Sequence, residues 1–386
     1  MNKKTNKETG YLFKDIDKIL ELESIFRQQQ LDALTFKPVS KAPVSTGLGY
    51  TGYIDDLDVF KPLYSYDEQY NDVKKMFENQ LRIANYYRYG CYGRIPTVFV
   101  DMRLVIESMF GVKLKSGAKS TEEFWSEPVD TDLKDLVKLG PPALSLGQFP
   151  VFKQYHEYFI ENMPEGFKMH MSGILSPFGT ALAIIGSRIF NEVYDRPELL
   201  LEFLDIITLT HIQTQRALFD IIGNKDPDEF YYFGACMPGG LMAAGDDLVN
   251  LSPEMVRTFE LPFLKKIAEN LGCKIFYHYC PHPKDTRSRY TAHIFKELIN
   301  TGYIIGLNSQ PMGYWAYLDY YEELKNNKFG IQSGIEFPQD FNSRDFYRVV
   351  EKLHENTYGK SGIHVTLREI KTEAQTKKFM DIWNKL

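Results

Sequence analysis

Short β-type runs and helical stretches alternate along most of the chain. Runs of branched and aromatic residues are separated by segments whose apolar residues recur at helical spacing, a pattern typical of βαβ units and a parallel sheet. We expect strands to begin at Ala42, Ile95, Lys168, Glu229, Lys274, Tyr303, Phe329 and Gly362. Eight parallel strands close naturally into a (β/α)8 barrel, or TIM barrel. The predicted fold class is therefore α/β, with this barrel as its architecture.

The first part of the chain has a different pattern. Phe13 to Leu34 carries apolar residues at helical spacing and a polar face of glutamines, which predicts an amphipathic helix. We expect residues 1–40 to form an N-terminal helical extension and residues 41–386 to form one catalytic barrel domain. Further along, Pro197 to Ile222 predicts a long helix with proline near its start, where the missing N–H costs nothing.

Composition and charge narrow the class of protein. The 386 residues are 44% hydrophobic and 25% charged, an ordinary globular composition, and the formal net charge of −6 gives no basic surface for nucleic acid. The four cysteines form no dense framework, which favours a reducing cytoplasm. No apolar run approaches the roughly 18 residues of a membrane span, and the N-terminus lacks the apolar region of a signal peptide.

One predicted strand carries two metal-binding residue types. In Lys274–Cys280 successive side chains point to opposite faces, so Phe276, His278 and Cys280 share one face. The strand therefore brings an imidazole and a thiol to one place, and both are ligands that zinc prefers. The alternative is a buried cysteine beside a hydrogen-bonded histidine, a common arrangement in protein cores.

Other polar residues follow the predicted strands, where active sites of such barrels lie. These strand-end candidates are Asp101, Ser172, Cys236, Asp246, Asp247, Asn308, Gln310, Glu336 and His364. Among them we predict His364 and Glu336 as metal ligands with His278 and Cys280, and Asp246, Asp247 and Asn308 as catalytic residues. We expect the two aspartates to fix the tautomer of an imidazole. The alternative is an acidic loop that caps its own backbone.

Several segments together resemble one enzyme superfamily. They are residues 173–178, 195–198, 245–248, 251–255, 261–265, 278–280 and 334–336, with sequences such as Gly-Asp-Asp-Leu, Leu-Ser-Pro-Glu-Met and His-Tyr-Cys. In these segments the chain resembles the uroporphyrinogen decarboxylase superfamily, over residues 165 to 386 above all. The resemblance implies a (β/α)8 barrel, in agreement with the strand pattern.

The resemblance also separates two chemistries. Decarboxylases of the superfamily carry an arginine-rich segment after the first strand, whereas residues 45–50 contain no arginine. Its zinc-dependent methyltransferases exchange methyl groups with a corrinoid protein, and His278 and Cys280 match their His-x-Cys zinc pair. Their third ligand is a cysteine near the last strand. This chain has no cysteine after Cys280, and His364 stands closest to that position, with Glu336 or an acidic loop residue as alternatives.

The resemblance therefore predicts a zinc-dependent methyltransferase that acts between a small substrate and a corrinoid protein. The substrate would be a methyl ether, such as a methoxy-aromatic compound, or a thiol. The chain has no Asp-x-His-x-x-Gly corrinoid-binding pattern, so cobalamin would be carried by a separate protein. Two rival hypotheses are a metal-free lyase of the decarboxylase type that acts on a smaller acid, and a non-catalytic barrel that binds a corrinoid protein or serves as a scaffold.

Overall fold

The computed structural model describes most of the chain. The described residues are 16–47, 62–115, 125–171, 173–223, 228–280, 292–309, 312–335, 337, 338, 340, 342–367, 370 and 372–386. All structural statements below concern these residues. Within them, no helix combines the length and the apolar character needed to cross a membrane.

A seven-stranded parallel sheet forms the centre of the molecule. Its order is β1 (Val44–Thr46), β13 (Ile363–Leu367), β12 (Gly330–Ile335), β11 (Ile304–Ser309), β10 (Ile275–His278), β9 (Leu241–Ala244) and β6 (Ile174–Leu175). All these pairs are parallel, and the register places His278 beside Asn308, Asn308 beside Gln332 and Gln332 beside His364. Because side chains alternate along a strand, these four lie in one row on one face of the sheet.

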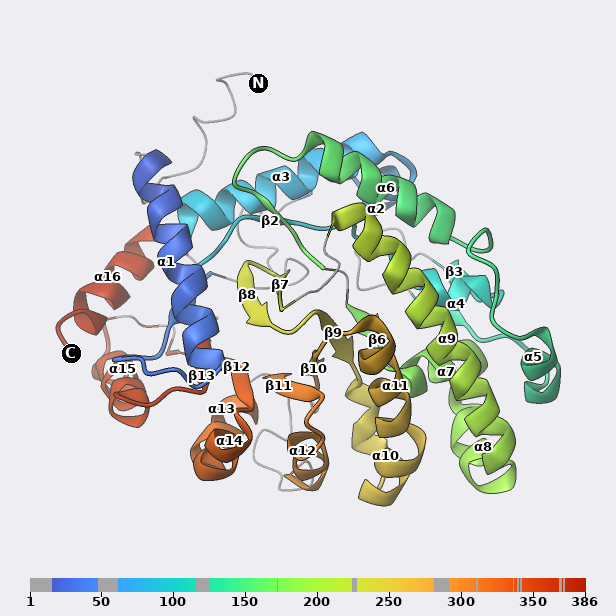
Figure 1. The fold of residues 1–386 in the computed structure, drawn as a ribbon. Coiled ribbons are helices and arrows are strands. Elements are labelled where there is room, and N and C mark those ends of the chain that lie inside the picture. The colour runs from blue at the N-terminus through green and yellow to red at the C-terminus, as the bar shows by residue number, and fades with distance from the viewer. Residues whose placement is uncertain are drawn as a thin grey trace.

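Helices cover the outer side of this sheet, as Figure 1 shows for α10, α12 and α14. The helices of the described residues are α1 (Ile16–Leu34), α2 (Tyr66–Asn71), α3 (Val73–Gly90), α4 (Val105–Met109), α5 (Leu133–Leu139), α6 (Phe149–Asn162), α7 (Pro177–Ile185), α8 (Ile189–Asp195), α9 (Pro197–Ile222), α10 (Pro253–Phe259), α11 (Leu261–Leu271), α12 (Ala292–Ile299), α13 (Met312–Asp319), α14 (Tyr321–Asn327), α15 (Arg344–Thr357) and α16 (Glu373–Trp383). Helix α9 has the predicted bounds, and Pro197 is in its first turn. The strands are largely buried, as is typical of parallel sheets, and they carry both apolar and polar buried side chains.

Two further pairs of strands lie outside this sheet, besides the short antiparallel pair of β3 (Lys113–Lys115) and β4 (Trp125–Glu127). Strands β2 (Thr97–Val98) and β5 (Lys168–Met169) pair in parallel. Strands β7 (Glu229–Tyr232) and β8 (Ala235–Pro238) form an antiparallel hairpin, which lies on the concave side of the sheet in Figure 1. The α/β class is thus confirmed, but no ladder among the described residues closes the strands into a barrel.

Three of the predicted strands lie outside the central sheet. Glu229 begins a strand as predicted, β7, but β7 pairs with β8 in the hairpin, and the strands predicted from Ile95 and Lys168 correspond to β2 and β5, which pair with each other. The missing sheet strand is β9, whose Leu-Met-Ala-Ala sequence contains no branched or aromatic β-former. Its position is determined by burial between β6 and β10 rather than by local preference.

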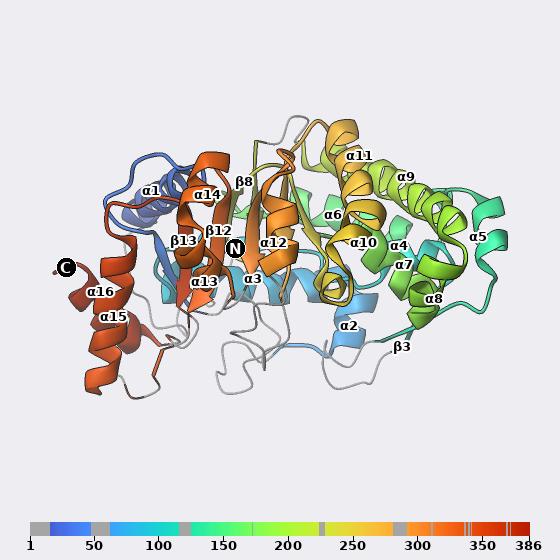
Figure 2. The same ribbon diagram turned by 90° about the horizontal axis from the view of Figure 1, so that it is seen from below.

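Helix α1 packs against the hairpin and against the beginnings of β12 and β13. Gln30 of α1 accepts a hydrogen bond from the backbone N–H of Cys236, and Gly362 donates its N–H to the carbonyl of Ala33. In Figure 2 the arrowheads of β12 and β13 point away from α1. The helix therefore covers the end of the sheet opposite to the ends of the strands where the predicted site residues lie.

Candidate functional site: a metal-type group at the end of β10

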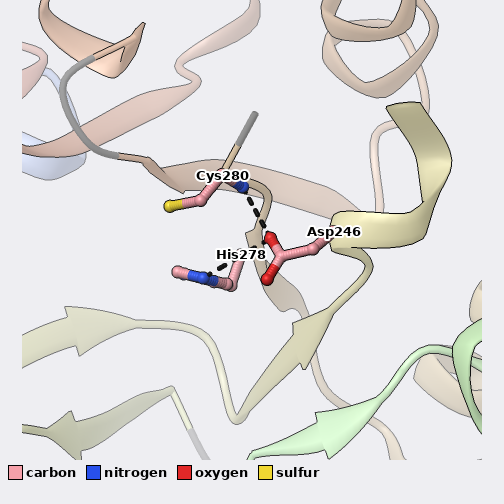
Figure 3. Close-up of side chains that lie close together, drawn as sticks. All are labelled: Asp246, His278 and Cys280. Atoms are coloured by element: carbon pink, nitrogen blue, oxygen red, sulfur yellow. Dashed lines mark hydrogen bonds and ion pairs between the residues drawn. The ribbon is translucent and has the colours of Figure 1, made fainter. Parts of the chain in front are cut away.

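Three predicted site residues meet at the end of β10. Asp246 belongs to the 3-10 helix η5 (Asp246–Asn250), His278 ends β10, and Cys280 follows it by two residues. One potential ligand atom from each lies within 4.8 Å of the others. Figure 3 shows the Cys280 thiol and the His278 imidazole on the same side of the strand end, with Asp246 reaching toward them. This is the arrangement that the alternation of His278 and Cys280 predicts.

Glycine at position 245 brings Asp246 to this place. The N–H of Gly245 donates to the carbonyl of His278, at 2.9 Å. A Cβ on Gly245 would stand 1.8 Å from the Tyr277 hydroxyl, so a larger residue would push the turn away from β10. Asp246 then accepts a 2.7 Å hydrogen bond from the Cys280 N–H through Oδ1, and the same oxygen lies 3.7 Å from His278 Nε2. The turn thus places the carboxylate over both potential ligands.

A row of hydrogen bonds determines which nitrogen of His278 faces this group. Gln332 donates from Nε2 to the Thr366 hydroxyl at 2.8 Å, so its Oε1 accepts from Asn308 Nδ2. Asn308 Oδ1 then faces His278 Nδ1 and accepts its proton. We call His278, Asn308, Gln332 and Thr366 the polar row. It leaves the lone pair of His278 on Nε2, the nitrogen that faces Asp246, as a metal ligand requires.

The electrostatic surroundings of His278 favour positive charge at this position. Burial by itself lowers the pKa of the imidazole, but the negative charge of Cys280, its hydrogen bond, Asp246 and Asn308 together raise the pKa to about 9. The site is not sealed, because the side chains of His278 and Asp246 keep 23% and 55% of their exposure. A bound cation would take the place of the proton between the same three groups.

The donor set agrees with zinc. Thiolate, imidazole and carboxylate are its usual protein ligands, and a site with three protein ligands keeps a position open for substrate. The Nε2 lone pair, the thiol and the carboxylate all converge here, and the second imidazole nitrogen is held by Asn308, as is usual for ligating histidines. The residues present therefore fit a catalytic zinc ion.

Of the other predicted site residues, His364 and Asp247 have different surroundings. His364 is fully buried on β13, its Nε2 lies 2.7 Å from the Ser45 hydroxyl, and it does not join the group at β10. Burial and the charge of Arg94 lower its pKa to about 3. Glu336 lies outside the described residues. Asp247 is directed to the start of α7, where its Oδ2 would lie 3.4 Å from a Cβ on Gly179.

The sequence indicated only one of the three residues that follow His278 in the polar row. Asn308 was predicted as a catalytic residue, and in the structure its Oδ1 faces His278 Nδ1. Gln332 and Thr366 were not predicted at all, although a polar residue inside the apolar strand 330–335 was a signal. Such a residue needs a partner when it is buried, and on neighbouring parallel strands that partner stands beside it.

Comparisons with known proteins show similarity in structure. No model of a protein family matches the sequence, and no curated protein matches it. Among solved structures, the chain is similar to a methyltransferase from Methanosarcina mazei, with a TM-score of 0.61 and 17% sequence identity. The match covers 93% of this chain and 98% of the methyltransferase. The two proteins therefore share a fold over nearly their whole length.

Proposed function

We propose that this protein is a zinc-dependent methyltransferase that moves a methyl group between a small substrate and a corrinoid protein. The observation that carries the proposal is the group of Asp246, His278 and Cys280 at the end of β10. The methyltransferase that shares the fold supports methyl transfer as the reaction. The substrate would be a methyl ether, such as a methoxy-aromatic compound, or a thiol, and cobalamin would arrive on a separate protein.

We also propose that the seven-stranded sheet and the pair of β2 and β5 are parts of one closed barrel. The hairpin tip supports this arrangement, because the N–H of Ile95 donates to the Gly234 carbonyl and the N–H of Met171 to the Tyr231 carbonyl. Arg94, just before β2, donates to the carbonyls of Thr46, Gly47 and Phe233. The guanidinium therefore connects the end of β1 to the tip of the hairpin. Among the described residues β1 and β2 do not pair directly, and Arg94 lies between them in their place.

Asp246, His278 and Cys280 would hold the zinc ion, which would serve as a Lewis acid for an ether oxygen or keep a thiol in its reactive thiolate form. The protein's own contribution is positioning. Asn308 holds the proton on His278 Nδ1, and the Cys280 N–H orients Asp246. Because His278 and Asp246 are each fixed by a second contact, little reorganisation of these two residues is needed when substrate enters.

The test compares zinc-loaded protein with chelator-treated protein in a spectroscopic assay. Reduced cobalamin is mixed with a methoxy-aromatic compound, and methylcobalamin with a thiol, in separate reactions. We expect the cobalamin spectrum to change in one of the two reactions when the protein is loaded with zinc, and in neither reaction when it has been treated with chelator. Unchanged spectra in both, with zinc-loaded protein and its corrinoid partner, would contradict methyl transfer. Decarboxylation of a small acid by the chelator-treated protein would establish the metal-free lyase instead.

A further inference from the structure

A cavity of about 560 Å³ lies beside the metal-type group. It is bounded by the ends of β2, β6 and β9 and by helices α4, α6 and α9, and we call it the α4 cavity. Its volume is within the range of small-molecule sites. It reaches the sheet at Leu175 and Ala244, and the register places Ala244 beside His278. Neighbouring strands are about 4.8 Å apart, so one end of the cavity is a single strand away from the metal-type group.

The chain from the end of β2 into α4 brings two carboxyl groups and one guanidinium to this cavity. Asp101, Arg103 and Glu107 all line it. Arg103 Nε lies 3.5 Å from Asp101 Oδ1, and the two side chains keep 40% and 15% of their exposure. Arg103 also lines a second cavity, to which neither Asp101 nor Glu107 belongs. The guanidinium therefore lies at the edge of the α4 cavity, where it compensates the charge of Asp101.

Glu107 has no cation beside it among the described residues. The residue is 4% exposed, and burial raises its pKa to about 7, opposed only by a hydrogen bond from its own backbone N–H. That N–H can satisfy one carboxyl oxygen. Neither oxygen is among the enclosed polar atoms that lack a hydrogen bond, so the second oxygen is open to the cavity that Glu107 lines. The α4 cavity thus contains a buried acid whose charge is uncompensated.

The rest of the lining adds no charge. His170 and His211 are neutral at physiological pH, because burial lowers the pKa of each to about 3. Five aromatic side chains also line the cavity, namely Phe99, Phe149, Phe152, Tyr232 and Phe233. The face of an aromatic ring is electrically negative and attracts a cation within about 6 Å of its centre. With Glu107 ionised, the lining therefore has one negative charge in excess, surrounded by rings that also favour positive charge.

These surroundings distinguish between charged and neutral molecules. A buried carboxylate without a counter-charge is costly, and an ammonium group that donates to it offsets the cost. A negatively charged molecule would meet the same carboxyl groups and a guanidinium that already lies beside Asp101. A neutral molecule would gain the packing against the rings but not their attraction for a cation. The cavity therefore favours an organic cation.

We propose that the α4 cavity binds the small substrate through an ammonium group, which would pair with the Glu107 carboxylate and lie against the aromatic rings. The proposed function gives a methyl ether or a thiol as the reacting group, and this inference adds that the same molecule carries an amine. It rests on the proposed function only for the role of the bound molecule as substrate. The preference for positive charge rests on the cavity alone.

The test measures binding to protein from which metal has been removed, so that it does not depend on catalysis. The probes are 2-phenylethylamine, 2-phenylethanol and 3-phenylpropanoate, which have similar size and are positive, neutral and negative at pH 7.5. Calorimetry should show that the wild-type protein binds the amine about ten-fold more tightly than the alcohol, the effect of one charge-assisted hydrogen bond, and binds the acid most weakly. Equal affinity for amine and alcohol, tighter binding of the acid, or no binding of the amine would overturn the proposal.

One variant then locates the preference. Glu107→Gln keeps the shape of the side chain and removes its charge, so we expect about ten-fold weaker binding of the amine and unchanged binding of the alcohol. Glu260→Gln is the matched control, because Glu260 is also fully buried, burial also raises its pKa to about 7, and it does not line the cavity. A folded Glu107→Gln variant that keeps the preference for the amine would overturn the proposal.

The outcome is separate from that of the proposed function. Selective binding of the amine without methyl transfer by zinc-loaded protein would contradict the proposed function and leave the cation site standing. Methyl transfer by a protein that binds amine and alcohol equally would overturn the cation site and leave the proposed function standing.

Discussion

Two histidines on the same face of one sheet have opposite surroundings. His278 and His364 stand at the two ends of a register row that crosses β10, β11, β12 and β13. His278 keeps 23% of its side-chain exposure and directs Nε2 toward Asp246. His364 is fully buried, and its Nε2 faces Ser45, whose hydroxyl donates to the Gly93 carbonyl. A position near a strand end is thus not enough for metal binding, because the free ring nitrogen must also face other ligands and open space.

The charged groups around the His278 and His364 rings also differ. Carboxylate and thiol groups raise the pKa of His278 to about 9, against the effect of its burial. Burial and the nearby Arg94 lower the pKa of His364 to about 3. One position therefore stabilises a cation, and the other excludes it. This contrast predicts how substitutions at the two ends of the row will differ.

Loss of the Cys280 thiol should have the largest effect. Cys280→Ala removes one of three potential ligands, so we expect zinc content to fall from close to one per chain to near zero, and methyl transfer to fall with it. Elemental analysis of protein purified without chelators measures the first effect and the cobalamin spectrum the second. Cys273→Ala is the matched control, a buried cysteine that comes just before the same strand. Full zinc occupancy in Cys280→Ala would show that the Cys280 thiol is not a zinc ligand.

Loss of the Asn308 amide should have a smaller effect at the same end of the row. Asn308→Ala removes the acceptor that holds His278 in its tautomer, and loss of such a partner typically weakens metal binding by about 10- to 100-fold. Competition with a chelator of known affinity gives the zinc dissociation constant. Under the same conditions His364→Leu should bind zinc as the wild type does. Equal weakening by both substitutions would mean that the effect comes from the sheet as a whole.

The sequence predicted the parts of the fold and site that depend on local pattern. Strand 275–278 was predicted from its branched and aromatic residues, and its alternation placed His278 and Cys280 together. Strand 241–244 was missed, because its formation depends on neighbours that are distant in the sequence.

The third potential ligand, Asp246, likewise depends on contacts between segments that are distant in the sequence. Asp246 joins the group because Gly245 passes against Tyr277, a contact between separate segments that no sequence pattern shows. His364 was predicted as a ligand from its position on the last strand alone. That prediction did not consider that three strand spacings separate His364 from His278. Residue types and alternation thus indicated the chemistry, whereas the choice of ligand depended on tertiary contacts.

The smallest predicted effect concerns folding stability at the buried end of the row. His364 has a folded-state pKa of about 3, below the value of about 6.5 expected in the unfolded chain. Between these values the unfolded state binds a proton that the folded state does not, so this histidine costs no stability above pH 6.5 and an increasing amount below it. The slope is about 1.4 kcal/mol per pH unit at most, which amounts to about 2 kcal/mol at pH 5.

His364→Leu should remove this contribution while it keeps the volume of the side chain nearly constant. At pH 7.5 we expect its free energy of unfolding to be within about 1 kcal/mol of the wild type, because the lost hydrogen bond to Ser45 is offset by removal of Nδ1, which has no partner among the described residues. At pH 5 the variant should be the more stable protein by about 1 to 2 kcal/mol. Urea unfolding of metal-free protein at both pH values measures the difference, with Thr208→Val, another buried polar residue, as control. Parallel pH profiles for His364→Leu and the wild type would show that His364 is protonated in the folded state, and the contrast with His278 would then fail.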